Sequence, residues 1–103
     1  MANFVKVGKV SDIKDKQMKS FQISGKTILI SRFGGKFYAT DEKCTHVGGP
    51  LSNGKLSDNI ITCPWHGSKF DIKTGSVVEG PAKTPLKTFE VKVEGEDLLV
   101  NLQ

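Results

Sequence analysis

The sequence predicts an all-β domain with a loop-rich segment inserted in its middle. Short runs in which apolar and polar residues alternate are typical of strands, and no long stretch shows the spacing of an amphipathic helix. Residues 42–82 hold three of the four prolines, both cysteines, both histidines and the single tryptophan. We therefore expect one domain over residues 1–103, in which residues 42–82 carry the chemistry and residues 1–41 and 83–103 form the scaffold.

The first expected hairpin lies in the N-terminal third. Residues 27–33 form a mainly apolar run that should be a strand buried on both faces. The Gly34-Gly35 pair that follows is a strong signal for a two-residue turn. Residues 36–40 should therefore return as a strand that pairs with residues 27–33.

A second hairpin is expected at the C-terminus. Residues 88–93 alternate between polar and apolar side chains, and residues 98–102 alternate again after Gly95 and Glu96. This pattern predicts two antiparallel strands, each with one apolar face.

The net charge of +4 is unevenly distributed along the chain. Residues 1–36 hold eight basic and two acidic side chains, whereas residues 42–82 hold four of each. The basic residues are scattered and lack interleaved aromatic residues, which argues against a nucleic-acid partner. The N-terminal residues MANFVKVGKV lack the apolar run of a signal peptide or membrane span, so we expect a cytoplasmic chain without a membrane contact.

Two pairs of metal-ligand residues occur in residues 42–82. Cys44 and His46 form a C-x-H pair, and Cys63 and His66 form a C-x-x-H pair after sixteen intervening residues. Two close pairs can complete a four-ligand site without closing a long loop within either pair. A disulfide would leave the paired histidines unexplained, whereas a Cys₂His₂ zinc site and a [2Fe–2S] cluster both fit the spacing.

The residues around both pairs resemble those of Rieske proteins. CTHVGGPL (residues 44–51) and CPWHGSKFD (residues 63–71) are similar to the two cluster-binding loops of that family. Residues 75–87 resemble the proline-bearing loop that covers the cluster. The resemblance implies the Rieske iron–sulfur fold, which is a small antiparallel β-sandwich or barrel with an inserted cluster-binding subdomain, and one [2Fe–2S] cluster.

The resemblance also implies how the cluster is bound. Cys44 and Cys63 should hold the inner iron, while His46 and His66 should hold the outer iron near the surface. Two thiolates make the oxidised cluster formally neutral, whereas four would make it a dianion. Because an electron is added more easily to a neutral cluster, histidine ligation raises the reduction potential.

Six further residues are expected to surround the cluster: Gly48, Trp65, Gly67, Ser68, Phe70 and Pro81. The glycines should let backbone N–H groups approach the sulfurs. By resemblance, Ser68 should donate a hydrogen bond to a bridging sulfide, and Phe70 replaces a tyrosine that donates to a cysteine sulfur in high-potential members. Losing that donor predicts a potential in the lower half of the Rieske range of about −150 to +300 mV.

Trp65 and Pro81 are expected to shield the cluster, with simple core packing as the alternative for Trp65. Lys43, Lys69 and the rim around Pro81 are candidate docking contacts for a redox partner, with ordinary solvated surface lysines as the alternative.

The resemblance implies a role in electron transfer. No histidine remains for the mononuclear iron of an oxygenase, and the glycine-rich nucleotide motif of a reductase is absent. We expect a soluble, monomeric ferredoxin, not itself an enzyme, that takes electrons from a flavin reductase and passes them to a terminal oxygenase. The alternatives are the small Rieske subunit of an assimilatory nitrite reductase and a zinc-stabilised binding module.

Overall fold

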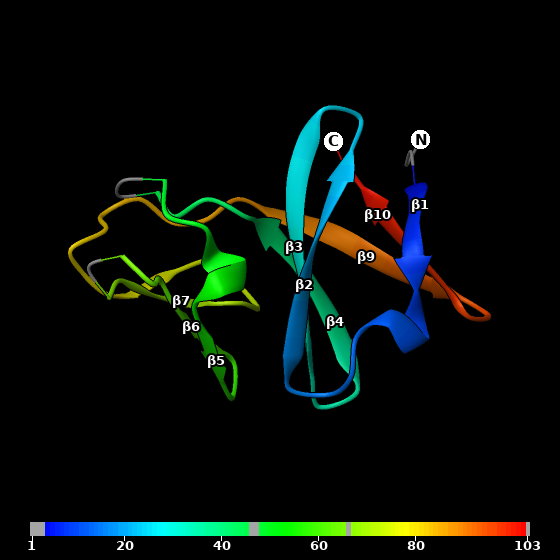
Figure 1. Ribbon diagram of the computed structural model, residues 1–103, viewed down its shortest axis with the longest axis horizontal. Helices are drawn as coiled ribbons and strands as arrows, with labels where there is room; N and C mark the ends of the chain where they lie inside the picture. The colour runs from blue at the N-terminus through cyan, green and yellow to red at the C-terminus, as the bar shows by residue number, and fades with distance from the viewer. Residues whose placement is uncertain (1–3, 46–47, 66, 103) are drawn as a thin grey trace.

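The computed structural model describes residues 4–45, 48–65 and 67–102. These residues form ten strands in two antiparallel sheets, which confirms the predicted all-β class. In Figure 1 the larger sheet fills the centre and right, and the smaller sheet lies to its left. The helices in this part of the chain are two three-residue 3₁₀ turns, η1 (Val10–Asp12) and η2 (Leu51–Asn53), and neither could cross a membrane.

The larger sheet contains six strands. They are β1 (Phe4–Lys9), β2 (Gln17–Ile23), β3 (Lys26–Phe33), β4 (Lys36–Asp41), β9 (Thr88–Glu94) and β10 (Asp97–Asn101). Their order across the sheet is β1-β10-β9-β4-β3-β2. Both predicted hairpins are present, because β3 pairs with β4 and β9 pairs with β10. The turn between β3 and β4 uses Gly34 and Gly35, whose φ values of 64° and 78° favour glycine.

The smaller sheet consists of four strands of three residues each. They are β5 (Lys55–Ser57), β6 (Ile60–Thr62), β7 (Lys69–Asp71) and β8 (Val77–Glu79), in that order across the sheet. Sequence reasoning predicted mainly loops here, since three residues are too few to show a strand period.

Strand β3 separates two hydrophobic cores. Ile28 and Ile30 belong to a core within the larger sheet that also includes Leu98 and Val100. Leu29 belongs to a second core, which lies between the two sheets. Because neighbouring side chains of a strand point to opposite faces, β3 contributes to both cores, as the sequence predicted. The second core also contains buried residues from the smaller sheet and its loops: Cys44, Leu51, Ile61, Cys63, Phe70, Ile72, Ala82 and Leu86.

The segment that carries the smaller sheet leaves and re-enters the larger sheet at one place. Thr40 of β4 pairs with Thr88 of β9, and the Asp41 N–H donates to the Lys87 carbonyl at 3.0 Å. The Lys87 N–H donates back to the Asp41 carboxylate at 3.3 Å. Residues 42–87 therefore form a single excursion between two paired strands, and we call this segment the lobe.

Candidate metal centre

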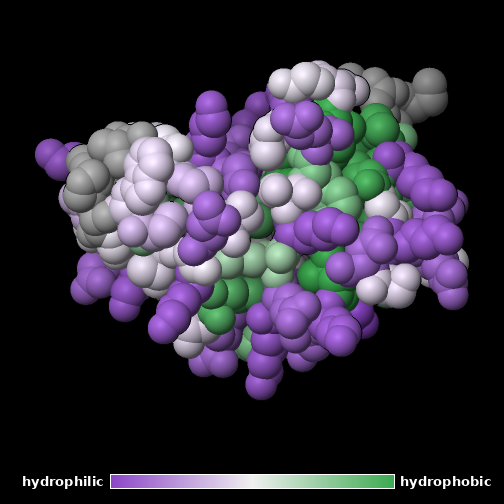
Figure 2. Space-filling view, in the orientation of Figure 1, coloured by the Kyte–Doolittle hydropathy of each residue, from purple (hydrophilic) through white to green (hydrophobic). Residues whose placement is uncertain are grey.

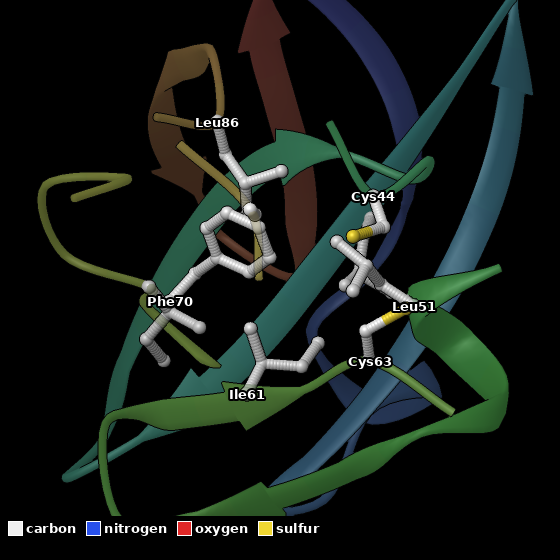
Figure 3. Packing of buried hydrophobic residues seen from close by; sticks show 9 residues of the cluster. Cys44, Leu51, Ile61, Cys63, Phe70 and Leu86 are labelled. Atoms are coloured by element: carbon white, nitrogen blue, oxygen red, sulfur yellow. The ribbon is translucent and has the colours of Figure 1, made fainter. Parts of the chain in front are cut away.

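Two cysteine thiols lie together in the core between the sheets. Cys44 is 3% exposed and Cys63 is 2% exposed, and their sulfurs are not joined in a disulfide. Cys44 lies shortly after β4, whereas Cys63 directly follows β6. Figure 3 shows both cysteines beside Leu51 at one side of this core. The structure therefore brings the two predicted thiol ligands together from separate loops.

The first cysteine loop, which runs from Cys44 to Gly49, is closed by its own backbone. The Cys44 N–H donates to the Gly49 carbonyl, and the Gly48 N–H donates to the Cys44 carbonyl, both at 2.8 Å. The Gly48 N–H is therefore used within the loop, and the approach of backbone N–H groups around Gly48, Gly67 and Lys69 to the sulfurs stays a prediction. Gly48 is suited to its φ of 76°, and its position would leave a Cβ free of neighbours.

Gly49 packs closely against the second cysteine loop. A Cβ at Gly49 would lie 2.8 Å from the Cys63 sulfur and 3.2 Å from two ring atoms of Trp65. Both contacts are shorter than ordinary van der Waals distances, so only glycine leaves room for the sulfur and the ring. The sequence motif contains this glycine, but its contact with Cys63 depends on how the two loops pack.

The second cysteine loop runs from Cys63 to Ser68. The Cys63 N–H donates to the Ser68 carbonyl at 2.8 Å, which closes this loop as the first is closed. Gly67 adopts a φ of 75°, with no neighbours around the position of a Cβ, so its role is also conformational. The backbone N–H of Trp65 donates a hydrogen bond to the Cys63 sulfur.

The pKa of the Cys63 thiol is raised above its ordinary value. Burial is the largest cause, and the neighbouring Cys44 thiol raises the pKa further, whereas the hydrogen bond from the Trp65 backbone lowers it. A thiolate buried at this position would be stabilised by a bound metal ion. Two adjacent, buried sulfur donors therefore fit a soft metal centre such as an iron–sulfur cluster.

The remaining predicted ligands, His46 and His66, lie outside the described residues. Within the described ranges, no three Cys, His, Asp or Glu residues come together to form a metal site. The four-residue ligand set therefore stays a prediction.

The other residues predicted around the cluster occupy contrasting environments. Phe70 is fully buried in the core that contains both cysteines. Trp65 is 49% exposed, so the core-packing alternative for this residue is wrong. Pro81 is also exposed, and the shielding role of Trp65 and Pro81 stays a prediction.

A strap, residues 80–86, is bonded to both cysteine loops through hydroxyl groups. The Thr45 hydroxyl donates to the Thr84 carbonyl at 2.5 Å, and the Ala82 N–H donates to the Ser68 hydroxyl oxygen at 3.0 Å. Ser68 and Ala82 are both buried. Because the Ser68 oxygen accepts from Ala82, its own proton stays available for another acceptor, which is compatible with the predicted bond to a sulfide.

Removing the Ser68 hydroxyl should loosen the strap. Ser68→Ala leaves the buried Ala82 N–H without its acceptor, at a cost of about 1–3 kcal/mol. We expect a lower unfolding temperature and faster hydrogen exchange at the Ala82 amide. Thr74→Val is the control, since it removes a hydroxyl that bonds Ser76 in an exposed turn. Equal exchange at Ala82 in both variants would show that Ser68 does not hold the strap.

Family comparison adds a direct finding to this geometry. Residues 3–90 match the model of the Rieske [2Fe-2S] domain. The chain belongs to the Rieske family. The predicted fold and the predicted cofactor, one Rieske-type [2Fe–2S] cluster, are thereby confirmed.

Several curated relatives of this Rieske protein are of similar length. It is 39% identical to the ferredoxin component of biphenyl 2,3-dioxygenase from Rhodococcus jostii (strain RHA1), covering 95% of this chain and 92% of that protein. It is 31% identical to the ferredoxin component of the naphthalene 1,2-dioxygenase/salicylate 5-hydroxylase systems of Ralstonia sp., covering 98% and 97%. It is also 37% identical to apoptosis-inducing factor 3 of Homo sapiens. That alignment covers 88% of this chain but only 15% of the human protein.

Solved structures that resemble this chain include ferredoxins of dioxygenase systems. The ferredoxin of carbazole 1,9a-dioxygenase from Nocardioides aromaticivorans IC177 superposes with a TM-score of 0.93 at 27% identity, over 99% of this Rieske protein and all of that chain. A chain from the complex of reduced oxygenase and oxidized ferredoxin in carbazole 1,9a-dioxygenase gives a TM-score of 0.90 at 34% identity, over 95% and 92% of the two chains.

Proposed function

We propose that this Rieske protein is a one-electron carrier that takes electrons from a flavin reductase and passes them to a terminal oxygenase. The observation that carries this proposal is the buried Cys44–Cys63 pair in a chain that spans 92% and 97% of two relatives named as dioxygenase ferredoxin components. The solved complex of an oxygenase with a ferredoxin supports the same acceptor class. On this proposal the chain transfers electrons without being an enzyme, as a cytoplasmic monomer, and has no nucleic-acid or membrane partner.

Each part of the proposed site has a physical role. Cys44 and Cys63 would hold the inner iron in the core, while His46 and His66 would hold the outer iron. A cluster held by these residues would supply one-electron redox chemistry. The backbone N–H of Trp65, which already bonds the Cys63 sulfur, would withdraw charge from that ligand and favour the more negative reduced state.

The purified protein should show the composition and the potential of this cluster. We expect two irons and two acid-labile sulfides per chain, uptake of one electron, and a midpoint potential in the lower half of about −150 to +300 mV. Iron and acid-labile sulfide analysis measures the composition, and absorption and EPR spectra during a redox titration measure the potential. A colourless protein that contains zinc and no sulfide would overturn the proposal, and a potential near the top of the range would contradict the predicted effect of Phe70.

A further inference from the structure

A groove of about 580 Å³ opens beside the first cysteine loop. Its walls come from the start of β3, from the end of β4 with the loop that follows, and from the start of β9. Three lysines that are far apart in the sequence line this groove, namely Lys26, Lys43 and Lys87. In Figure 2, hydrophilic side chains stand along the upper edge of the molecule where the lobe joins the larger sheet.

Two of these lysines share one aromatic ring. The ammonium groups of Lys26 and Lys87 lie 5.9 Å and 5.5 Å from the centroid of the Phe89 ring. Phe89 is buried in the core of the larger sheet, so its ring gives both ammonium groups a fixed support at the groove. Across the described part of the chain, Lys26, Lys43 and Lys87 form no ion pair.

Both acidic residues that line the groove, Asp41 and Glu42, accept hydrogen bonds. The Asp41 carboxylate accepts the backbone N–H of Lys87 at 3.3 Å. The Glu42 carboxylate is largely buried and accepts from the N–H and the hydroxyl of Ser52, at 2.8 Å and 2.5 Å. Hydrogen bonding therefore directs Glu42 toward η2, and the lysine ammonium groups are left without a carboxylate partner.

The other cysteine loop does not offer the same positive charge. Lys69, which the sequence suggested as a docking contact, lies 3.7 Å from the Glu79 carboxylate. Lys43, the other suggested lysine, is in the groove with Lys26 and Lys87. Of the two lysines suggested by the sequence, Lys43 is therefore the one without an ion pair, and it lies beside the first cysteine loop.

We infer that Lys26, Lys43 and Lys87 form a docking groove for an acidic surface segment of the redox-partner protein. Thr45 and Gly48 also line the groove, so a partner segment held there lies against the first cysteine loop. Aspartate and glutamate side chains of the partner would supply the ion-pair partners that these three lysines lack, which steers association and orients the partner. This inference rests on the proposed electron-carrier function.

The test compares two charge-reversed forms of the cluster-bearing protein. Lys26→Glu, Lys43→Glu and Lys87→Glu together change the groove. Lys14→Glu, Lys36→Glu and Lys55→Glu together give the same change in net charge at exposed positions outside it. At low ionic strength, oxidation of the reduced protein by ferricyanide should slow about tenfold in the groove variant and much less in the control. The corresponding groove variant with three Lys→Gln changes should show an intermediate effect, and it replaces the Glu variant if that does not fold.

A hexaglutamate peptide reports docking directly. Its titration should shift the amide NMR signals of the groove residues in the native protein and in the control, but not in the groove variant. Equal oxidation rates and equal peptide shifts in groove variant and control would overturn the inference while the proposed function stands. Inorganic phosphate that shifts the same amides as strongly at equal ionic strength would also overturn it, in favour of a small-anion site. A protein without a reversible cluster would instead overturn the proposed function itself.

Discussion

Replacing His66 with cysteine is expected to lower the midpoint potential by a few hundred millivolts. The substitution adds an anionic thiolate in place of a neutral imidazole, so the added electron meets a more negative cluster. The reduction potentials of four-cysteine clusters in plant-type ferredoxins are about −400 mV, whereas those of Rieske clusters are between about −150 and +300 mV. A redox titration followed by EPR measures the shift and reports the change in ligand type.

The control for this prediction adds a thiol without changing a ligand. Ser76→Cys places a cysteine at an exposed position beyond β7, where it should leave the potential unchanged. If His66→Cys also kept the native potential and EPR spectrum, His66 would not be an iron ligand and the proposed ligand set would be wrong.

Replacing Gly75 with alanine is expected to destabilise the protein much more than replacing Gly35. Both glycines have a φ of 78°, so both alanines suffer the same conformational strain of about 1–2 kcal/mol. A Cβ at Gly75 would also lie only 2.2 Å from the Leu86 carbonyl oxygen, whereas a Cβ at Gly35 meets nothing within 4 Å. The backbone must shift to relieve this contact, and we expect a total loss of about 3–5 kcal/mol.

The Gly75→Ala substitution should also disturb the strap. The Leu86 N–H donates to the Gly75 carbonyl at 2.8 Å, so a shift of either backbone disturbs the end of residues 80–86. Urea unfolding gives the change in stability, and the rate at which a chelator bleaches the cluster reports access to the metal centre. Similar decreases in the free energy of unfolding in Gly75→Ala and Gly35→Ala would contradict this prediction. They would mean that the Leu86 backbone moves away from the new Cβ with little loss of stability.

The fold was predictable where a local pattern determines it. The β3–β4 hairpin follows from an apolar run and two glycines, and β9 and β10 follow from alternation. The edge strand β1 was missed because the alternation of Val5 and Val7 is short and is followed by Gly8 and Lys9, and its pairing with β10 joins opposite ends of the chain. Most strands of the smaller sheet were too short to predict, because pairing with their neighbours defines them.

The same distinction applies to the site. Cys44 and Cys63 were identified from their spacing and the surrounding motifs, and the structure places them side by side. The roles of Gly49, Thr45 and the Ser68–Ala82 hydrogen bond depend on how three loops pack against one another. The position of Lys26, Lys43 and Lys87 in one groove could likewise not be predicted, because these lysines are far apart in the sequence.

The lobe begins and ends at neighbouring positions of two paired strands, so it is an insertion between β4 and β9. Since Asp41 and Lys87 are hydrogen-bonded neighbours, a short turn can connect β4 to β9 as well as the long excursion does. Lengthening such a connection is inexpensive, because each doubling of a loop adds only about 0.6 kcal/mol of closure entropy. A new binding segment can therefore be spliced between two paired strands without altering their register. The inserted segment covers the Leu29 face of β3, so the residues of that face must match the segment that packs on them.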